Sequence, residues 1–226
     1  MACRPWPGKR VEAEAAWQRF LALKRTQANA ARDFVAWHRG RPRFGVWAIE
    51  VDHLQVRNRL RRGRAALAPF LLSGYRRQPH VTLFASGFPC DEPTRSGDVS
   101  WATVCAQADR IARDGPAPFT LRIGGIISLA GAPCLQVQPE PALFRLRDVL
   151  LALGPEDRTV PYEPHLTLGL YAAAYAPQRV RRQLRGLHSS GCDAEIRVSA
   201  VSFLTFDTAT ILGPLRPELR VSLPDL

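Results

Sequence analysis

Two copies of one short motif constrain this chain more than any other feature. Pro79-His-Val-Thr-Leu83 and Pro164-His-Leu-Thr-Leu168 share the pattern P-H-x-T-L, and their histidines are 85 positions apart. One H-x-T in a chain with five histidines is an unsurprising chance match, whereas two copies in the same context are not. Side chains at i and i+2 of a β-strand point to the same face, so each motif predicts a strand that presents His and Thr together. The paired side chains are His80 with Thr82 and His165 with Thr167.

The segments around the motifs predict the same order of elements twice. The first half is expected to contain a strand at 44–51, a helix at 54–72, the motif strand at 79–84, a helix at 98–113 and a strand at 119–127. The second half is expected to contain a strand at 134–138, a helix at 141–153, the motif strand at 164–168, a helix at 177–187 and a strand at 195–206. Asp52 is the expected cap of the helix at 54–72, and an edge strand is expected within 210–223.

This repeated order predicts an internal duplication of the architecture. Two such halves facing one another would put the two motifs on opposite walls of one cleft. The expected domain covers 43–226, with lobes at about 43–130 and 131–226. Before it, residues 11–38 read as one amphipathic helix that Gly40 and Pro42 end, so 1–42 is predicted to be an N-terminal helical extension.

The charge of the chain favours an anionic partner. Its 31 Lys and Arg residues against 20 Asp and Glu give a net charge of +11, and nearly all the cations are arginine, whose planar fork matches phosphate oxygens. Arginine richness also follows from genome composition, so the charge supports a nucleic-acid partner without proving it. The basic helix face with Arg57, Arg59, Arg61, Arg62 and Arg64 is either an RNA-tracking face or a solvated surface.

The two histidines suit the cleavage of a phosphodiester. That reaction needs a base to take a proton from the attacking hydroxyl or water and an acid to protonate the leaving oxygen. Histidine, with an ordinary pKa near 6.5, fills either role near neutral pH, and the threonine hydroxyls can donate to the phosphate oxygens. The chain has no H-E-x-x-H, no C-x-x-C and no P-loop lysine motif, so no metal and no cofactor are expected.

The paired motifs resemble those of the 2H phosphoesterase superfamily. That superfamily includes bacterial 2′,5′ RNA ligase-like proteins, RNA 2′,3′-cyclic phosphodiesterases, and plant and yeast cyclic nucleotide phosphodiesterases. The resemblance covers about Phe44 to Phe206. It implies the bilobal, LigT-like α+β fold, with two pseudo-symmetric antiparallel-sheet lobes, helices outside and a central cleft. It also implies that His80, Thr82, His165 and Thr167 are the catalytic set. Ligase-like members often place an arginine after the second motif, as in H-x-T-L-A-R, whereas this chain continues with Gly169, Leu170 and Tyr171.

Five further residues are candidate substrate contacts: Phe84, Tyr171, Arg76, Arg77 and Arg122. The two aromatic rings follow the motifs and either stack on a base or ribose or pack in the core. The two arginines just before the first motif either hold a phosphate of a longer RNA or lie in a solvated loop. Arg122 alternates with apolar neighbours and, if it reaches the cleft from a central strand, demands an anion there.

The leading hypothesis is a metal-independent phosphodiesterase acting on 2′,3′-cyclic phosphate ends of RNA or on related cyclic or 2′,5′-linked nucleotides. The alternatives are 2′,5′ RNA ligase activity, which exchanges the roles of the two histidines, and a non-catalytic RNA-binding or nucleotide-sensing module. Binding alone does not need two acid-base groups in matched positions. No apolar run reaches the roughly 18 to 20 residues of a membrane span, so we expect a cytoplasmic monomer without a membrane partner.

Overall fold

The computed structural model describes residues 9–157, 160–184, 187 and 194–225. Its helices are α1 (Lys9–Leu21), α2 (Ala31–His38), α3 (Leu54–Leu67), α4 (Trp101–Asp114), α5 (Pro141–Leu151) and α6 (Pro177–Leu184), with the 3-10 turns η1 (Ala68–Phe70) and η3 (Thr208–Thr210). Its strands are β1 (Arg43–Glu50), β2 (His80–Cys90), β3 (Asp98–Ser100), β4 (Phe119–Ser128), β5 (Pro133–Val137), β6 (His165–Thr167), β7 (Ala194–Val198), β8 (Ala200–Asp207) and β9 (Arg216–Ser222).

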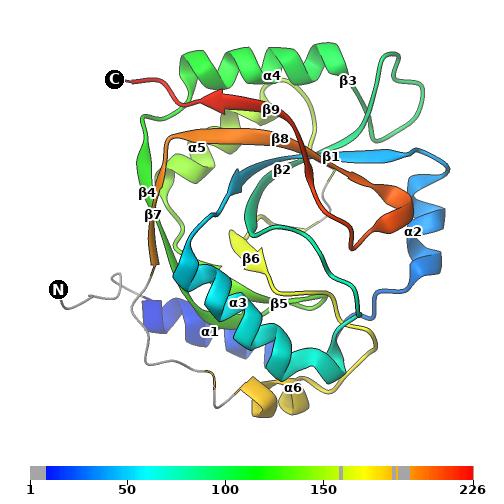
Figure 1. The fold of residues 1–226 in the computed structure, drawn as a ribbon, viewed down its shortest axis with the longest axis vertical. Coiled ribbons are helices and arrows are strands. Elements are labelled where there is room, and N and C mark those ends of the chain that lie inside the picture. The colour runs from blue at the N-terminus through cyan, green and yellow to red at the C-terminus, as the bar shows by residue number, and fades with distance from the viewer. Residues whose placement is uncertain (1–8, 158–159, 185–186, 188–193, 226) are drawn as a thin grey trace.

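The described strands form two sheets, as predicted for an α+β fold (Figure 1). The first sheet has the order β3-β2-β1-β8-β9 and the second has the order β6-β5-β4-β7. All pairs are antiparallel except β2 with β3, which run parallel at the edge of the first sheet. The edge strand expected within 210–223 is β9.

The sheets do not follow the expected division of the chain near residue 130. Strand β4 belongs to the second sheet, and β8 and β9 return to the first. The single strand expected at 195–206 is wrong, because β7 and β8 are separate strands in different sheets, with Ser199 between them. Each sheet therefore combines strands from both halves of the sequence.

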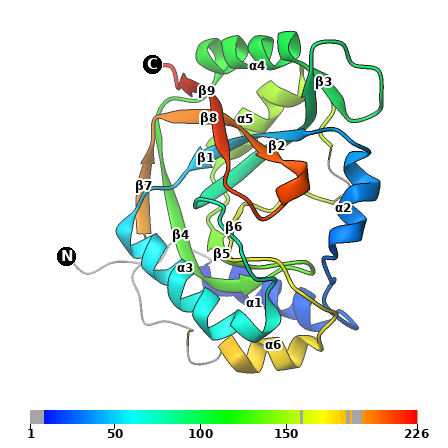
Figure 2. The same ribbon diagram turned by 45° about the vertical axis from the view of Figure 1, so that its right-hand side comes forward.

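Helices α4 and α5 pack on the first sheet. Helix α3 lies against the second sheet at Leu168 and Ile126, and α6 packs on α3 and α1 (Figure 2). Gly63 allows α3 to approach closely, since a Cβ atom there would lie 2.3 Å from the Leu168 side chain. The expected capping by Asp52 is wrong: α3 starts after His53 without a side-chain cap, and Asp52 instead forms an ion pair with Arg57 at 2.6 Å.

The single helix expected over 11–38 is also wrong, because the chain forms α1 and α2 with an extended segment between them. Backbone N–H groups of that segment bind carbonyl groups of distant loops: Thr26 donates to Tyr175, Gln27 to Ala130 and Asn29 to Tyr171. These bonds replace the helical ladder that a continuous helix would have made. Helix α2 ends at His38, as expected from Gly40, which adopts a φ of +80°.

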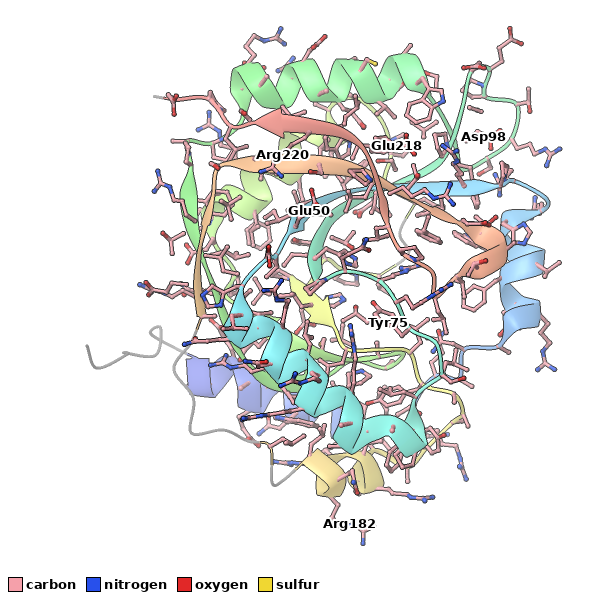
Figure 3. All side chains as sticks on the ribbon, in the orientation of Figure 1. Glu50, Tyr75, Asp98, Arg182, Glu218 and Arg220 are labelled. Carbon is pink, nitrogen blue, oxygen red and sulfur yellow. The ribbon has the colours of Figure 1, made fainter. Side chains whose placement is uncertain are left out.

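We call the face of each sheet that carries the motif histidine its motif face. On the first sheet, register places Glu50 opposite His80 and Ala48 opposite Thr82. Glu50 accepts a hydrogen bond from Ser202 at 2.6 Å and lies 3.7 Å from Arg220 (Figure 3). Farther along the same face, a small apolar cluster packs against Trp37 of α2.

Helix α1 covers part of the motif face of the second sheet. Cys134 pairs with Thr167 on one side and with Ile127 on the other, so these three side chains share one face. Ala16 of α1 packs against Ile127 and Cys134, while α3 lies on the opposite side of β4 and β5 (Figures 1 and 2). The N-terminal extension is therefore packed against the same faces that carry the catalytic candidates.

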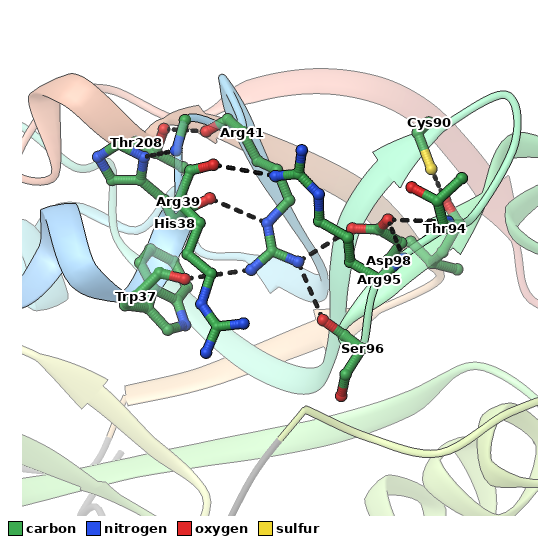
Figure 4. Close-up of polar contacts among 12 residues, drawn as sticks. Trp37, His38, Arg39, Arg41, Cys90, Thr94, Arg95, Ser96, Asp98 and Thr208 are labelled. Carbon is green, nitrogen blue, oxygen red and sulfur yellow. Dashed lines mark hydrogen bonds and ion pairs between the residues drawn. The ribbon is translucent and has the colours of Figure 1, made fainter.

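A buried guanidinium fixes α2 to the first sheet (Figure 4). Arg41 donates to the carbonyl groups of Trp37 and His38 in the last turn of α2, and its Nη1 binds the Asp98 carboxylate at 2.9 Å. Its guanidinium carbon also lies 3.5 Å from the centre of the Phe88 ring. Burial alone would raise the pKa of Asp98, but the hydrogen bond from Arg41 and backbone N–H groups lower it. Arg41 thus satisfies helix carbonyls and a carboxylate at once.

We expect Arg41→Met to lower the free energy of unfolding by about 3 to 5 kcal/mol, because it leaves the Asp98 charge buried without its cation. The measurement is urea unfolding followed by circular dichroism. Arg43→Met is the matched control, since the pair of Arg43 with Glu218 is more exposed than that of Arg41 with Asp98 and its loss costs about 1 kcal/mol or less. Equal, small losses in both variants would contradict the role assigned to Arg41.

Candidate functional site

The two motifs lie on strands β2 and β6, which contact each other although they belong to different sheets. Val81 and Leu166 are fully buried in the core, as the alternation of a strand requires. The motif side chains point to the other face, where His80 is 8% exposed and His165, Thr82 and Thr167 are partly exposed. The structure therefore brings together the four residues that the motifs predict.

Both histidines are held by the same local hydrogen bond. Nδ1 of His80 lies 2.8 Å from the carbonyl oxygen of Gln78, and Nδ1 of His165 lies 2.6 Å from that of Glu163. A carbonyl oxygen can only accept, so each Nδ1 carries the proton and donates it. In the neutral ring this leaves the lone pair on Nε2, the nitrogen on the opposite side of the ring from the carbonyl. The two motifs thus present the same tautomer.

His80 stays neutral at physiological pH. Its pKa is lowered to about 4, mainly by burial and further by the positive charges of Arg77 and His165, while the hydrogen bond to Gln78 opposes this shift. The effect of His165 shows that the two imidazoles are within electrostatic reach of each other. A neutral imidazole is ready to accept a proton, so His80 has the properties of a general base.

His165 has polar neighbours on β5 and α1. Gln136 lies opposite His165 in the sheet, and its amide nitrogen lies 3.4 Å from a carboxylate oxygen of Glu12. Glu163, whose carbonyl oxygen holds His165, also accepts a hydrogen bond from Arg19 through its carboxylate at 2.8 Å. Helix α1 therefore supports the second motif from the motif face.

Tyr75 and Arg64 also belong to the site, although Tyr75 was not predicted and Arg64 was predicted only as part of the basic helix face. Tyr75 projects from the segment between α3 and β2 (Figure 3), and its hydroxyl is hydrogen-bonded to the Thr167 side chain. Nε of Arg64 donates to the carbonyl oxygen of Leu168 at 2.6 Å, and its guanidinium lies 5.0 Å from the Tyr75 ring. The one sequence signal for these residues is their position: Tyr75 closely precedes the first motif, and Arg64 follows the small Gly63 on α3.

The stacking roles expected for Phe84 and Tyr171 are corrected by burial. Phe84 is 1% exposed and Tyr171 is fully buried, with its hydroxyl 2.6 Å from the Ser128 hydroxyl. The register explains Phe84: Thr82 pairs with Ala48 and Phe84 with its neighbour Trp47, so β2 carries an extra residue here. This bulge turns Phe84 to the face opposite His80. Both rings are core residues.

The three arginines expected to contact the substrate lie in different surroundings. Arg77 is partly buried next to the first motif, where it donates to the carbonyl oxygen of Ile211 at 2.6 Å and covers the Phe206 ring at 3.9 Å. The neighbouring Arg76 is exposed. Arg122 does not join the motifs, because it forms an exposed ion pair with Glu195 across β4 and β7 at 2.9 Å.

Two further properties concern only the described part of the chain. No three His, Cys, Asp or Glu side chains come together there as a set of metal ligands. No helix within the same residues is long and apolar enough to cross a bilayer.

Solved structures share this fold over nearly their whole length. E. coli LigT in its apo form has 18% identity and a TM-score of 0.53, covering 81% of this chain and 99% of LigT. A structure described as a phosphoesterase has 18% identity and a TM-score of 0.53, covering 81% and 99%. The protein TT0787 of Thermus thermophilus has 17% identity and a TM-score of 0.52, covering 80% and 97%. At identities this low, the comparison shows similarity of fold alone.

The sequence itself identifies the family. No curated protein matches the chain. A sequence model described as the 2′-5′ RNA ligase superfamily matches residues 43–210, which include both histidine motifs. The match spans most of the chain, and the fold agrees with it. This chain therefore belongs to the 2′-5′ RNA ligase superfamily of two-histidine phosphoesterases.

Proposed function

We propose that this protein is a metal-independent phosphodiesterase that opens 2′,3′-cyclic phosphates at RNA ends or in related cyclic or 2′,5′-linked nucleotides. The observation that carries the proposal is the matched pair of hydrogen bonds from Nδ1 of His80 and His165 to carbonyl oxygens two residues upstream. These bonds orient two imidazoles identically and leave each Nε2 for proton transfer. Two such groups are what an in-line displacement at phosphorus requires.

In the proposed reaction, Nε2 of His80 takes a proton from a water molecule, and the water oxygen attacks phosphorus. The bond from phosphorus to the 2′ or 3′ oxygen breaks, and protonated His165 gives its proton to that leaving oxygen. The product is a phosphomonoester with a free hydroxyl, and proton exchange with solvent restores both histidines. The roles follow from the low pKa of His80, which keeps it in the form of a base.

Two other activities use the same site. The family description names a 2′-5′ RNA ligase, and in ligation of a cyclic phosphate end a 5′ hydroxyl would take the place of the attacking water. A module that only binds RNA would use the positive charge of +11 without proton transfer. The identical orientation of both imidazoles favours catalysis, because binding a phosphate does not require matched tautomers.

We expect His80→Ala and His165→Ala each to lower kcat by about 100-fold to 10,000-fold, the usual contribution of a general acid or base. The substrates are 2′,3′-cyclic AMP, a short RNA ending in a cyclic phosphate and 2′,5′-linked oligoadenylate. Product formation is measured by chromatography, with EDTA present throughout. Ligation is measured in parallel from the corresponding RNA ends.

The control is His38→Ala, because His38 lies at the end of α2 and is expected to leave turnover unchanged. Turnover that EDTA abolishes would refute the metal-independent mechanism. If these substrates bound tightly but none were turned over, the catalytic proposals would be refuted and the non-catalytic binding module would be favoured.

The pH dependence tests the role of His80. Its low pKa predicts that kcat/KM does not decline as pH falls from 7 to 5 and declines only near pH 4, where the free base becomes protonated. The check is a pH profile of kcat/KM together with an NMR titration of the His80 ring. An acid limb near pH 6.5, the ordinary value for histidine, would contradict the assignment of His80 as the base.

A further inference from the structure

Three buried polar atoms without a hydrogen-bond partner lie next to the two motifs. Among the described residues, these atoms are Nη2 of Arg64, Nε of Arg77 and Oε1 of Gln136. Buried polar groups in proteins are almost always paired, so unpaired ones that gather at one site indicate a partner that binds there. Two of the three are donors on guanidinium cations, which calls for an acceptor with negative charge.

Neither guanidinium has a carboxylate to balance it in the described part of the chain. Arg64 contacts the Leu168 carbonyl oxygen and the Tyr75 ring, and Arg77 contacts the Ile211 carbonyl oxygen and a phenylalanine ring. Burial lowers the pKa of both guanidinium groups, which shows that each has lost favourable hydration. A buried cation is costly unless an anion accompanies it, so both residues are in place for a negatively charged ligand.

Both cations lie at the catalytic pair. Arg64 is anchored at Leu168, the residue after Thr167, and Arg77 is close enough to His80 to lower its pKa. Tyr75 is next to both arginines, and its hydroxyl is bound to Thr167. Burial raises the pKa of this phenol, so it keeps its proton and takes part as a hydroxyl group.

We infer that Arg64 and Arg77 bind the non-bridging oxygens of the reacting phosphate, with the Tyr75 hydroxyl positioning Thr167 beside them. This inference rests on the proposed function and names the groups that hold its substrate. A guanidinium presents donors in a plane that matches two phosphate oxygens, and its charge stabilises the negative charge that these oxygens carry during displacement. The arginines come from α3 and from the segment before β2, so the site needs both sheets in place.

The first test uses inorganic phosphate as the probe and isothermal titration calorimetry as the measurement. We expect the wild-type protein to bind phosphate, and Arg64→Gln and Arg77→Gln each to weaken binding by about 10-fold to 100-fold, the effect of one charge-assisted hydrogen-bonding partner. Arg113→Gln and Arg145→Gln are matched controls, because these exposed arginines lie on α4 and α5, the helices that pack on the first sheet. We expect binding by the controls to stay within about twofold of the wild type, as is usual for exposed charges.

Equal losses of affinity in all four variants would mean that phosphate binding depends only on the overall charge of the protein, and they would overturn the inference. So would a wild-type protein that does not bind phosphate. Because Arg77 also supports a loop, thermal unfolding must first show that each variant is folded. If Arg77→Gln does not fold, Arg77→Lys replaces it, since lysine keeps the charge but loses the planar fork, and we expect weaker phosphate binding with it too.

The second test measures kcat/KM for 2′,3′-cyclic AMP. We expect a loss of about 100-fold or more in Arg64→Gln and Arg77→Gln and no loss in the two controls. Arg77→Gln should also move the acid limb of the kcat/KM profile to higher pH, because the positive charge that opposes protonation of His80 is then lost. A purely structural role of Arg77 would not produce this shift. Phosphate binding that depends on both arginines without turnover would refute the proposed function alone. Turnover that survives both substitutions would refute the inference alone.

Discussion

The exchange of strands between the two halves of the chain fixes the relative position of the two histidines. The pair β1 and β8 forms the centre of the first sheet, and the pair β5 and β4 forms the centre of the second. In each pair, one strand comes from the half that carries the neighbouring motif and the other comes from the opposite half. Separating the halves would break backbone ladders in both sheets, and buried backbone groups do not remain unpaired. The backbone thus sets where the two histidines lie, and no side-chain contact between them is needed.

Short-range bonds then set the orientation of each ring. The carbonyl oxygens of Gln78 and Glu163 select the tautomer of His80 and His165, and they act through only two residues of chain. The electrostatic environment is not symmetric, however. His80 is almost completely buried and faces the charge of Arg77, whereas His165 is partly exposed and has polar neighbours on α1. In the proposed reaction, this difference in environment lets one histidine act as the base and the other as the acid.

The sequence correctly predicted those features of the fold that depend on local periodicity. The alternation of P-H-x-T-L was enough to place His80 and Thr82 on one face and Val81 in the core, because a strand has a period of two. The same rule failed for Phe84, since a bulge adds one residue between Thr82 and Phe84, and nothing in the composition of β2 marks it. The exchange of β4 and β8 was missed as well, because a repeated order of elements does not specify which strands pair. The contact of Arg64 with the second motif was not predicted for a related reason. It depends on α3 packing against the other half of the chain.

The residues around the catalytic pair come from parts of the chain that the motifs do not specify. Arg64 belongs to α3, Tyr75 and Arg77 to the segment before β2, and Gln136 to β5. Helix α1 adds Glu12 and Arg19 next to the second motif, and it lies outside the matched range 43–210. A fold of this kind can keep its two histidines while the surrounding contacts change, so membership of the superfamily does not determine the substrate. In the proposed reaction, the substrate would meet Arg64 and Arg77 as well as the two motifs, beside the contacts that α1 makes with the second motif.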